Sequence, residues 1–178
     1  MKKIILLLLM FSAGQLMAQR YMTRNAEVYF LSDKDAFEVV EATNNQVGAV
    51  VDLSSNDIAF QIQMRAFKFK IALMEEHFNE NYVESEKYPK ATFKGTFTNL
   101  PADLSKQHEL IVAGVMDFHG VQKDIEVNVS LQFIDGELGG TSNFVLLCSD
   151  FGIKIPKIVS DKLANEIQVT VKAALTKI

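Results

Sequence analysis

The sequence predicts an all-β fold, an antiparallel barrel of about eight strands with one or two short helices. Three observations predict it. Apolar and polar residues alternate along most of the chain, turn residues interrupt these runs repeatedly, and residues 110–115 and 144–148 are apolar at both parities. Alternation with a period of two is typical of half-buried antiparallel strands. Strands apolar on both faces favour a barrel with a helix packed outside over a sandwich.

The first residues have the order of a secretory signal peptide. Lys2 and Lys3 precede an apolar run at residues 4–11, which smaller residues follow. This run is far shorter than the roughly 18 residues that a transmembrane helix needs. We therefore expect residues 1–18 to be a signal peptide, residues 19–178 to form one β-barrel domain, and the chain to have no transmembrane segment.

The strands are expected in chain order from their alternation. The first three lie around residues 26–31, 36–42 and 47–53, with turns at residues 32–35 and at Asn44-Asn45. A strand follows at residues 58–64, after which the apolar residues change from even to odd positions. Arg65 and Ala66 therefore indicate a bulge or bend. The clearest later strands cover residues 91–97, 125–133 and 167–175.

Turns and helices account for the remaining segments. Turn residues are found at residues 99–105, at Asp135-Gly136 and around Gly120, which supplies backbone freedom between two long strands. Residues 72–86 lack alternation and precede Pro89, so a short helix is expected there. Residues 156–164 are a second candidate for a helical turn before the last strand.

Charge and cysteine content exclude several classes of protein. The chain has 18 basic and 22 acidic residues, a net charge of −4 that becomes −6 when Lys2 and Lys3 are removed. Basic and acidic residues are interspersed, so no basic stripe for nucleic acid is present. Cys148 is the only cysteine, which excludes an intramolecular disulfide. The apolar residues before it indicate a buried structural thiol.

Enzymatic chemistry finds little support in the residue pattern. A cluster of carboxylates is compatible with a glycosidase, but on a helix such residues usually form a solvated face; its members are Glu75, Glu76, Glu80, Glu84 and Glu86. The three histidines have no zinc-site spacing, and His119 is expected to be a hydrogen-bonded residue at a strand end. Nucleophile-elbow and phosphate-loop motifs are absent from the sequence. We predict a non-enzymatic protein with no catalytic residues and no metal.

An eight-stranded barrel is either filled by its own side chains or holds one slender ligand, and both remain open here. Small residues on otherwise bulky faces favour unfilled space; these are Ala91, Gly95, Gly114 and Ala173. The side chains expected to line the lumen are Phe60, Ile62, Met64, Phe93, Phe97, Val127, Val129, Leu131, Val169 and Val171.

Three segments resemble a known family. Residues 86–93 read Glu-Lys-Tyr-Pro-Lys-Ala-Thr-Phe, residues 114–123 contain Asp-Phe-His-Gly-Val, and residues 149–153 read Ser-Asp-Phe-Gly-Ile. They resemble the YceI-like family, the lipocalin-like polyisoprenoid-binding proteins of the bacterial periplasm. The family often has a His-Ser-x-Val strand and an Arg-Asp-x-His-Leu segment. Here residues 25–28 read Asn-Ala-Glu-Val and residues 74–78 read Met-Glu-Glu-His-Phe, so only His77 matches.

The resemblance implies a lipocalin-like barrel in the periplasm whose apolar lumen holds an isoprenoid, such as a quinone tail or a polyprenyl carrier lipid. We expect binding, storage or transport of this lipid, and the alternative is a ligand-free barrel that acts as an interaction or stress-response module. The candidates for the polar mouth are Glu76, His77, Asn79 and Tyr82. Strand edges and the apolar residues 153–159 are compatible with a homodimer.

Overall fold

The computed structural model describes residues 19–32, 39–155 and 165–178. Within these residues the strands are β1 (Arg20–Ser32), β2 (Val40–Asp52), β3 (Asp57–Gln63), β4 (Lys68–Phe69), β5 (Lys90–Thr98), β6 (His108–Phe118), β7 (Val121–Ile134), β8 (Glu137–Leu147) and β9 (Glu166–Lys177). The helical segments are the 3-10 turn η2 (Met64–Ala66), the α-helix α2 (Ala72–His77), the π-helical turn η3 (Phe78–Tyr82) and the 3-10 turn η4 (Cys148–Phe151).

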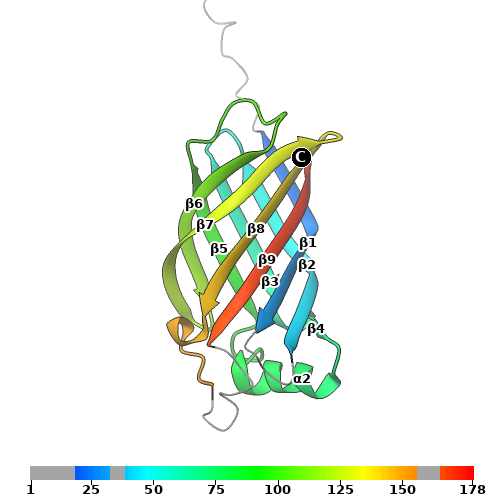
Figure 1. Cartoon of the computed structure of the whole chain (residues 1–178), viewed down its shortest axis with the longest axis vertical. Helices are drawn as coiled ribbons and strands as arrows, with labels where there is room; N and C mark the ends of the chain where they lie inside the picture. Colours follow the sequence, from blue (N-terminus) through cyan, green and yellow to red (C-terminus); the bar gives the residue numbers. More distant parts are fainter. Residues whose placement is uncertain (1–18, 33–38, 156–164) are drawn as a thin grey trace, which may run out of the picture.

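The eight long strands form a closed antiparallel barrel, as the sequence predicts. Their order is β1-β9-β8-β7-β6-β5-β3-β2, the pairing of β1 with β2 closes the ring, and the short β4 extends along β2. Figure 1 shows α2 and η4 at one end of the barrel, called here the capped end. The opposite end carries the β2–β3 and β7–β8 turns and the β5–β6 loop, and is called the closed end.

The expected turn at Asn44-Asn45 is wrong, because β2 continues through it as one strand. Asn44 is fully buried, its Nδ2 donates to the Gln63 carbonyl (2.9 Å), and its Oδ1 accepts from the Gln46 amide (2.8 Å). The register against β1 shifts here, which marks a bulge. The carboxamide thus bonds the backbone inside the strand instead of starting a turn.

The expected turn at residues 32–35 lies largely outside the described residues, and the other predicted breaks within the described residues agree with the sequence. The change of parity after Met64 corresponds to η2, between β3 and β4. The segment expected to be helical forms α2 and η3, whereas the second helical candidate, residues 156–164, lies outside the described residues. Both predicted tight hairpins have two residues with positive φ, which favours glycine at the second: His119 (53°) with Gly120 (75°), and Asp135 (52°) with Gly136 (89°).

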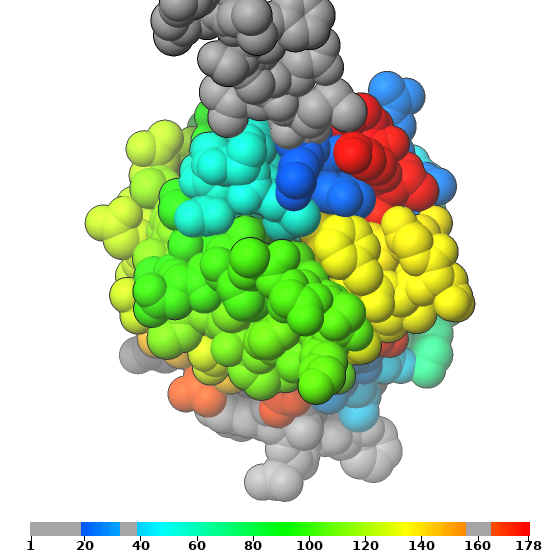
Figure 2. Space-filling model, turned by 90° about the horizontal axis from the view of Figure 1, so that it is seen from above, coloured from blue at the N-terminus to red at the C-terminus, as the bar shows by residue number. Residues whose placement is uncertain are grey.

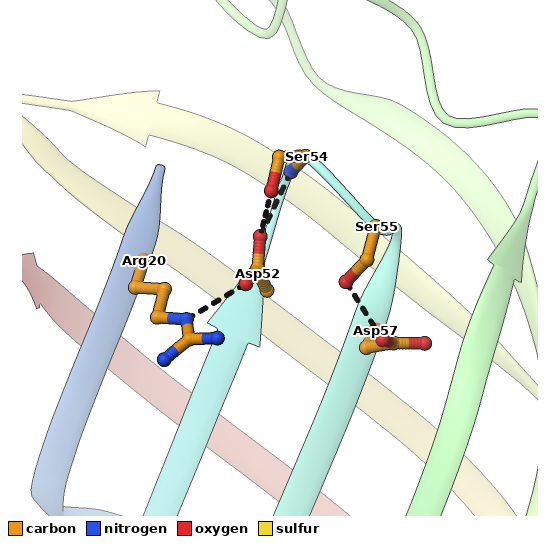
Figure 3. A network of polar contacts seen from close by, with 5 residues as sticks. All are labelled: Arg20, Asp52, Ser54, Ser55 and Asp57. Carbon is orange, nitrogen blue, oxygen red and sulfur yellow. Dashed lines mark hydrogen bonds and ion pairs between the residues drawn. The ribbon is translucent and has the colours of Figure 1, made fainter. Parts of the chain in front are cut away.

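Polar contacts fix the first three strands at the closed end (Figure 3). Asp52 accepts hydrogen bonds from the Ser54 hydroxyl (2.5 Å) and backbone amide (3.0 Å), and pairs with Arg20 (2.8 Å). Ser55 donates to Asp57 across the same turn. The hydrogen bond from Ser54, followed by that from Arg20, lowers the pKa of Asp52 to about 2. These contacts tie the start of β1 to the β2–β3 turn.

The lumen near the closed end is filled with side chains. Six inward residues are at most 2% exposed: Val51, Phe97, Val112, Leu131, Leu138 and Leu175. Leu104, on the β5–β6 loop, is 3% exposed, and its carbonyl accepts a hydrogen bond from the Phe133 amide (2.8 Å). Figure 2 looks onto this end and shows the loop, in green, beside the cyan β2–β3 turn and the yellow β7–β8 turn.

Two of the small residues do not leave space in the lumen as expected. Gly95 and Gly114 face each other across β5 and β6. A Cβ on Gly114 would lie 2.3 Å from the Lys94 carbonyl oxygen, and one on Gly95 would lie 2.8 Å from Phe93 and from Val112. The glycines instead allow the two strands and the Phe93 ring to approach closely.

Candidate functional site: a cavity beneath the helical cap

The half of the barrel near the capped end encloses a cavity of about 430 Å³. Side chains from β1, β2, β3, β5, β6, β8 and β9 form its walls, and η2, β4, α2, η3, η4 and the segments that connect them to the strands supply the rest of its lining. The lining includes Ile71 and Leu73, which are 45% and 56% exposed at the start of the helical cap that α2 and η3 form. The cavity therefore reaches the protein surface beside α2.

A cluster of phenylalanines joins the cap to the barrel. Rings from β1, the β3–β4 connection, β4 and η3 pack with centroids 5.0 to 5.8 Å apart, and all four line the cavity: Phe30, Phe67, Phe69 and Phe78. Aromatic pairs at such distances add to the free energy of apolar burial. The cap is thus packed onto the barrel by residues that also form the cavity wall.

Ion pairs hold the outer side of the cap. Glu75 of α2 pairs with Lys68 (2.7 Å) and accepts a hydrogen bond from the Phe69 amide (3.3 Å). Lys68 lowers the pKa of Glu75. Lys70 pairs with Glu41 on β2 (2.5 Å), which also accepts a hydrogen bond from Tyr29; this bond raises the pKa of Tyr29 to about 12. Glu75, one member of the carboxylate cluster, therefore has a structural partner.

The barrel wall has a gap at the capped end. The pairing of β7 with β8 reaches only from Ile134–Glu137 to Val129–Ser142. The parts of the two strands nearer the capped end are therefore not paired with each other. Phe151 of η4 is 1% exposed and packs against Phe118 with ring centroids 5.4 Å apart. Asp150 pairs with Lys123 of β7. The η4 turn thus covers this gap.

His119 connects the three segments that carry the family resemblance. Its Nδ1 lies 3.0 Å from the Phe151 carbonyl, its Nε2 lies 2.9 Å from Glu84, and its ring packs on Tyr88 at 4.5 Å. Both polar partners are acceptors, so both ring nitrogens donate when the imidazole is protonated. The prediction of a hydrogen-bonded histidine at a strand end is confirmed.

The structure divides the residues expected in the lumen into two groups. Ile62, Met64, Val169 and Val171 line the cavity. The other six lie outside its lining. Phe97, Val129 and Leu131 are buried in the core, and Phe60, Phe93 and Val127 are partly buried against it.

The expected mouth residues are divided in the same way. His77 and Tyr82 line the cavity, and burial raises the pKa of Tyr82. Glu76 is exposed and lies outside the lining. The Asn79 side chain donates to the Glu75 carbonyl (2.8 Å), and its buried Oδ1 has no hydrogen-bond partner within the described part of the chain.

Sequence reasoning missed several lining residues, including Val28, Phe30, Met116, Phe144 and Ile167. Alternation places Val28, Phe30 and Ile167 on an inward face, whereas Phe144 lies in a segment that is apolar at both parities. It is the order of the strands in the barrel, however, that brings these residues together at the capped end.

The cavity also contains the single cysteine. Cys148 is half-buried, and burial raises the pKa of its thiol to about 11, which disfavours the reactive thiolate. Among the described residues, no group of three or more His, Cys, Asp or Glu side chains is arranged to hold a metal ion. The described helices include none that is both long and apolar enough to span a bilayer.

Solved structures with this fold share little sequence with the chain. A polyisoprenoid-binding domain from Saccharophagus degradans, implicated in plant cell wall breakdown, is similar with a TM-score of 0.76 and 11% identity, over 90% of this chain and 99% of that chain. BcnA from Burkholderia cenocepacia gives 0.70 and 16%, over 85% and 96%. A Campylobacter jejuni YceI protein gives 0.64 and 16%, over 82% and 89%.

No curated protein matches the chain. The family model of the YceI-like domain, in contrast, matches residues 21–175, nearly the whole of the described barrel. The lipocalin-like barrel, the His119 contacts between the three resembling segments and this match agree with one another, and the chain belongs to the YceI-like family.

Proposed function

We propose that this protein binds an isoprenoid-type lipid in the cavity beneath the cap and stores or carries it without chemical change. One observation carries the proposal, the apolar character of the lining. Among the described lining residues, the side chains with an O–H, N–H or S–H group are Ser32, His77, Tyr82 and Cys148. The others are aliphatic, aromatic or methionine side chains. Such a surface favours a hydrocarbon chain over a polar metabolite.

The energetics of burial are sufficient for useful affinity. Each buried CH₂ contributes about 0.8 kcal/mol, so one five-carbon prenyl unit contributes about 4 kcal/mol before ordering costs. Three units contribute about 12 kcal/mol, which leaves about 8 kcal/mol, the equivalent of micromolar affinity, after ordering costs of about 4 kcal/mol. His77 and Tyr82, the two polar residues that the cap contributes to the lining, are the candidates to contact the head group.

The relatives support the same class of ligand. The Saccharophagus degradans structure is named a polyisoprenoid-binding domain, and the family resemblance points to a quinone tail or a polyprenyl carrier lipid. The order of charged, apolar and small residues at positions 1–18 supports export, and hence a periplasmic location for the mature chain. A periplasmic carrier would shield the chain of such a lipid from water.

A cavity-filling substitution tests the proposal. Val171 on β9 lines the cavity, whereas Ala174 on the same strand is exposed. We expect Val171→Trp to lower the binding of farnesol and of a short-chain ubiquinone at least tenfold, and Ala174→Trp to leave it within twofold. The measurement is displacement of the fluorescent probe N-phenyl-1-naphthylamine from the purified proteins, with circular dichroism to confirm folding.

Native mass spectrometry of the secreted protein distinguishes this function from the ligand-free alternative. A co-purifying mass of several hundred daltons, present in the wild type and lost in Val171→Trp, supports lipid binding. A bare protein mass, combined with no uptake of farnesol, a quinone or a polyprenol, contradicts the proposal and supports a ligand-free interaction module.

A further inference from the structure

The cavity ends partway along the barrel, at a defined layer of side chains. Ile62 and Ala91 face each other across β3 and β5, and both line the cavity. The next inward pair toward the closed end is Phe60 with Phe93, and neither lines it. On the neighbouring strand Met116, the partner of Phe93, still belongs to the lining. The floor of the cavity therefore coincides with the two phenylalanines.

Phe93 extends away from the cavity, toward the closed end. A Cβ built on Gly95, the next inward residue of β5 in that direction, would lie 2.8 Å from the Cζ of Phe93. The ring therefore occupies the space that Gly95 leaves over the β5–β6 contact. Beyond it the lumen is filled, since Phe97 and Val112 are 2% and 0% exposed.

We propose that Phe93 sets the length of chain that the barrel accepts, an inference that rests on the function proposed above. If each chain carbon takes about the volume of a water molecule in the liquid, roughly 30 Å³, the cavity of about 430 Å³ holds about 14 carbons, close to three prenyl units. A longer chain inserts only this part and leaves the rest outside the mouth. The ligand class is thus a lipid whose first three or so units decide its affinity.

The binding of a series of n-alkanols from decanol to octadecanol measures the length of chain that the cavity accepts. We expect the affinity of the wild type to rise by up to about fourfold per added CH₂ and to level off near 14 carbons. Removing the ring in Phe93→Ala opens on the order of 100 Å³. The chain length at which the affinity levels off should therefore increase by about three carbons. Probe displacement gives the affinities, and geraniol, farnesol and geranylgeraniol provide the isoprenoid counterpart.

Phe133→Ala is the matched control. It removes the same ring from the filled end of β7, where Phe133 packs on Tyr21 with centroids 5.3 Å apart, outside the cavity lining. The levelling point should stay where it is in the wild type. If Phe93→Ala does not fold, Phe93→Leu, with a smaller side chain, should extend the limit by about one carbon, and Phe93→Trp should shorten it.

The outcomes separate the two proposals. An affinity that keeps rising to octadecanol in the wild type, or a limit that Phe133→Ala moves as far as Phe93→Ala, overturns the role of Phe93 and leaves lipid binding intact. The same holds if no Phe93 variant changes the limit. Failure of every alkanol and prenol to bind overturns both.

Discussion

The substitutions Gly120→Ala and Gly136→Ala form a controlled pair that tests how the capped end is held. Both glycines are the second residue of a two-residue hairpin turn, with φ of 75° and 89°. Their surroundings differ. A Cβ on Gly120 would lie 2.6 Å from Cε1 of Tyr88, whereas a Cβ on Gly136 would have no atom within 4 Å.

The expected magnitudes follow from that difference. Placing alanine at positive φ costs about 1 kcal/mol at either position. Gly120→Ala must also displace the Tyr88 ring from its packing on His119, and overpacking of this kind costs about 1 to 3 kcal/mol more. The total is therefore about 1 kcal/mol for Gly136→Ala and about 2 to 4 kcal/mol for Gly120→Ala.

Urea denaturation of the mature protein gives both free energies of unfolding, and thermal melting should show the same ranking at about 2 to 4 °C per kcal/mol. Adding Tyr88→Ala completes a double-mutant cycle, in which the extra cost of Gly120→Ala should largely vanish. Equal costs at the two glycines, or additive effects in the cycle, would refute the role assigned to Tyr88.

Two further predictions concern the closed half of the barrel. Gly114→Ala should destabilise the protein by about 3 to 5 kcal/mol in urea denaturation, because its Cβ would meet the Lys94 carbonyl oxygen at 2.3 Å. Gly48→Ala, whose Cβ would have its nearest contact at 3.9 Å, should cost less than about 1 kcal/mol. Similar costs for the two variants would contradict the close approach of β5 and β6. The pKa of Asp52 is lowered from 3.8 to about 2, so its contribution to stability is full above about pH 4 and is lost as the pH falls through 2. The difference in melting temperature between the wild type and Asp52→Asn should therefore shrink from pH 5 toward pH 2, and a difference that stays constant would argue against the contacts of Asp52.

Most of the barrel is predictable from the sequence because period-two alternation reports directly which side chains face inward. The bend at Arg65 is predictable for the same reason, since inward residues can change parity along a strand only where the backbone bulges or bends. Asn44 shows where this reasoning fails. A pair of asparagines is normally a turn signal, and only the partners of the buried carboxamide, Gln63 and Gln46, reveal a bulge.

The extent of the cavity could not be predicted, because alternation separates inside from outside but carries no information on position along the barrel axis. Phe97 and Val169 have equally good inward patterns, yet one is buried in the filled half and the other lines the cavity. Gly95 shows the same limit. The absence of a side chain there indicates free space in the sequence, whereas in the structure a ring from two residues earlier on the same strand occupies that space.

The division of the barrel into a filled half and a hollow half has a physical consequence for a lipid-binding protein. An empty apolar cavity forgoes dispersion contacts and lowers stability, so a barrel hollow from end to end would depend on its ligand to stay folded. Here the filled half, with Val112, Leu131 and Leu138 almost fully buried, supplies a core that needs no ligand. Under the proposed function, a lipid can enter and leave the capped half while this core stays folded, and the layer of Phe60 and Phe93 separates the two halves.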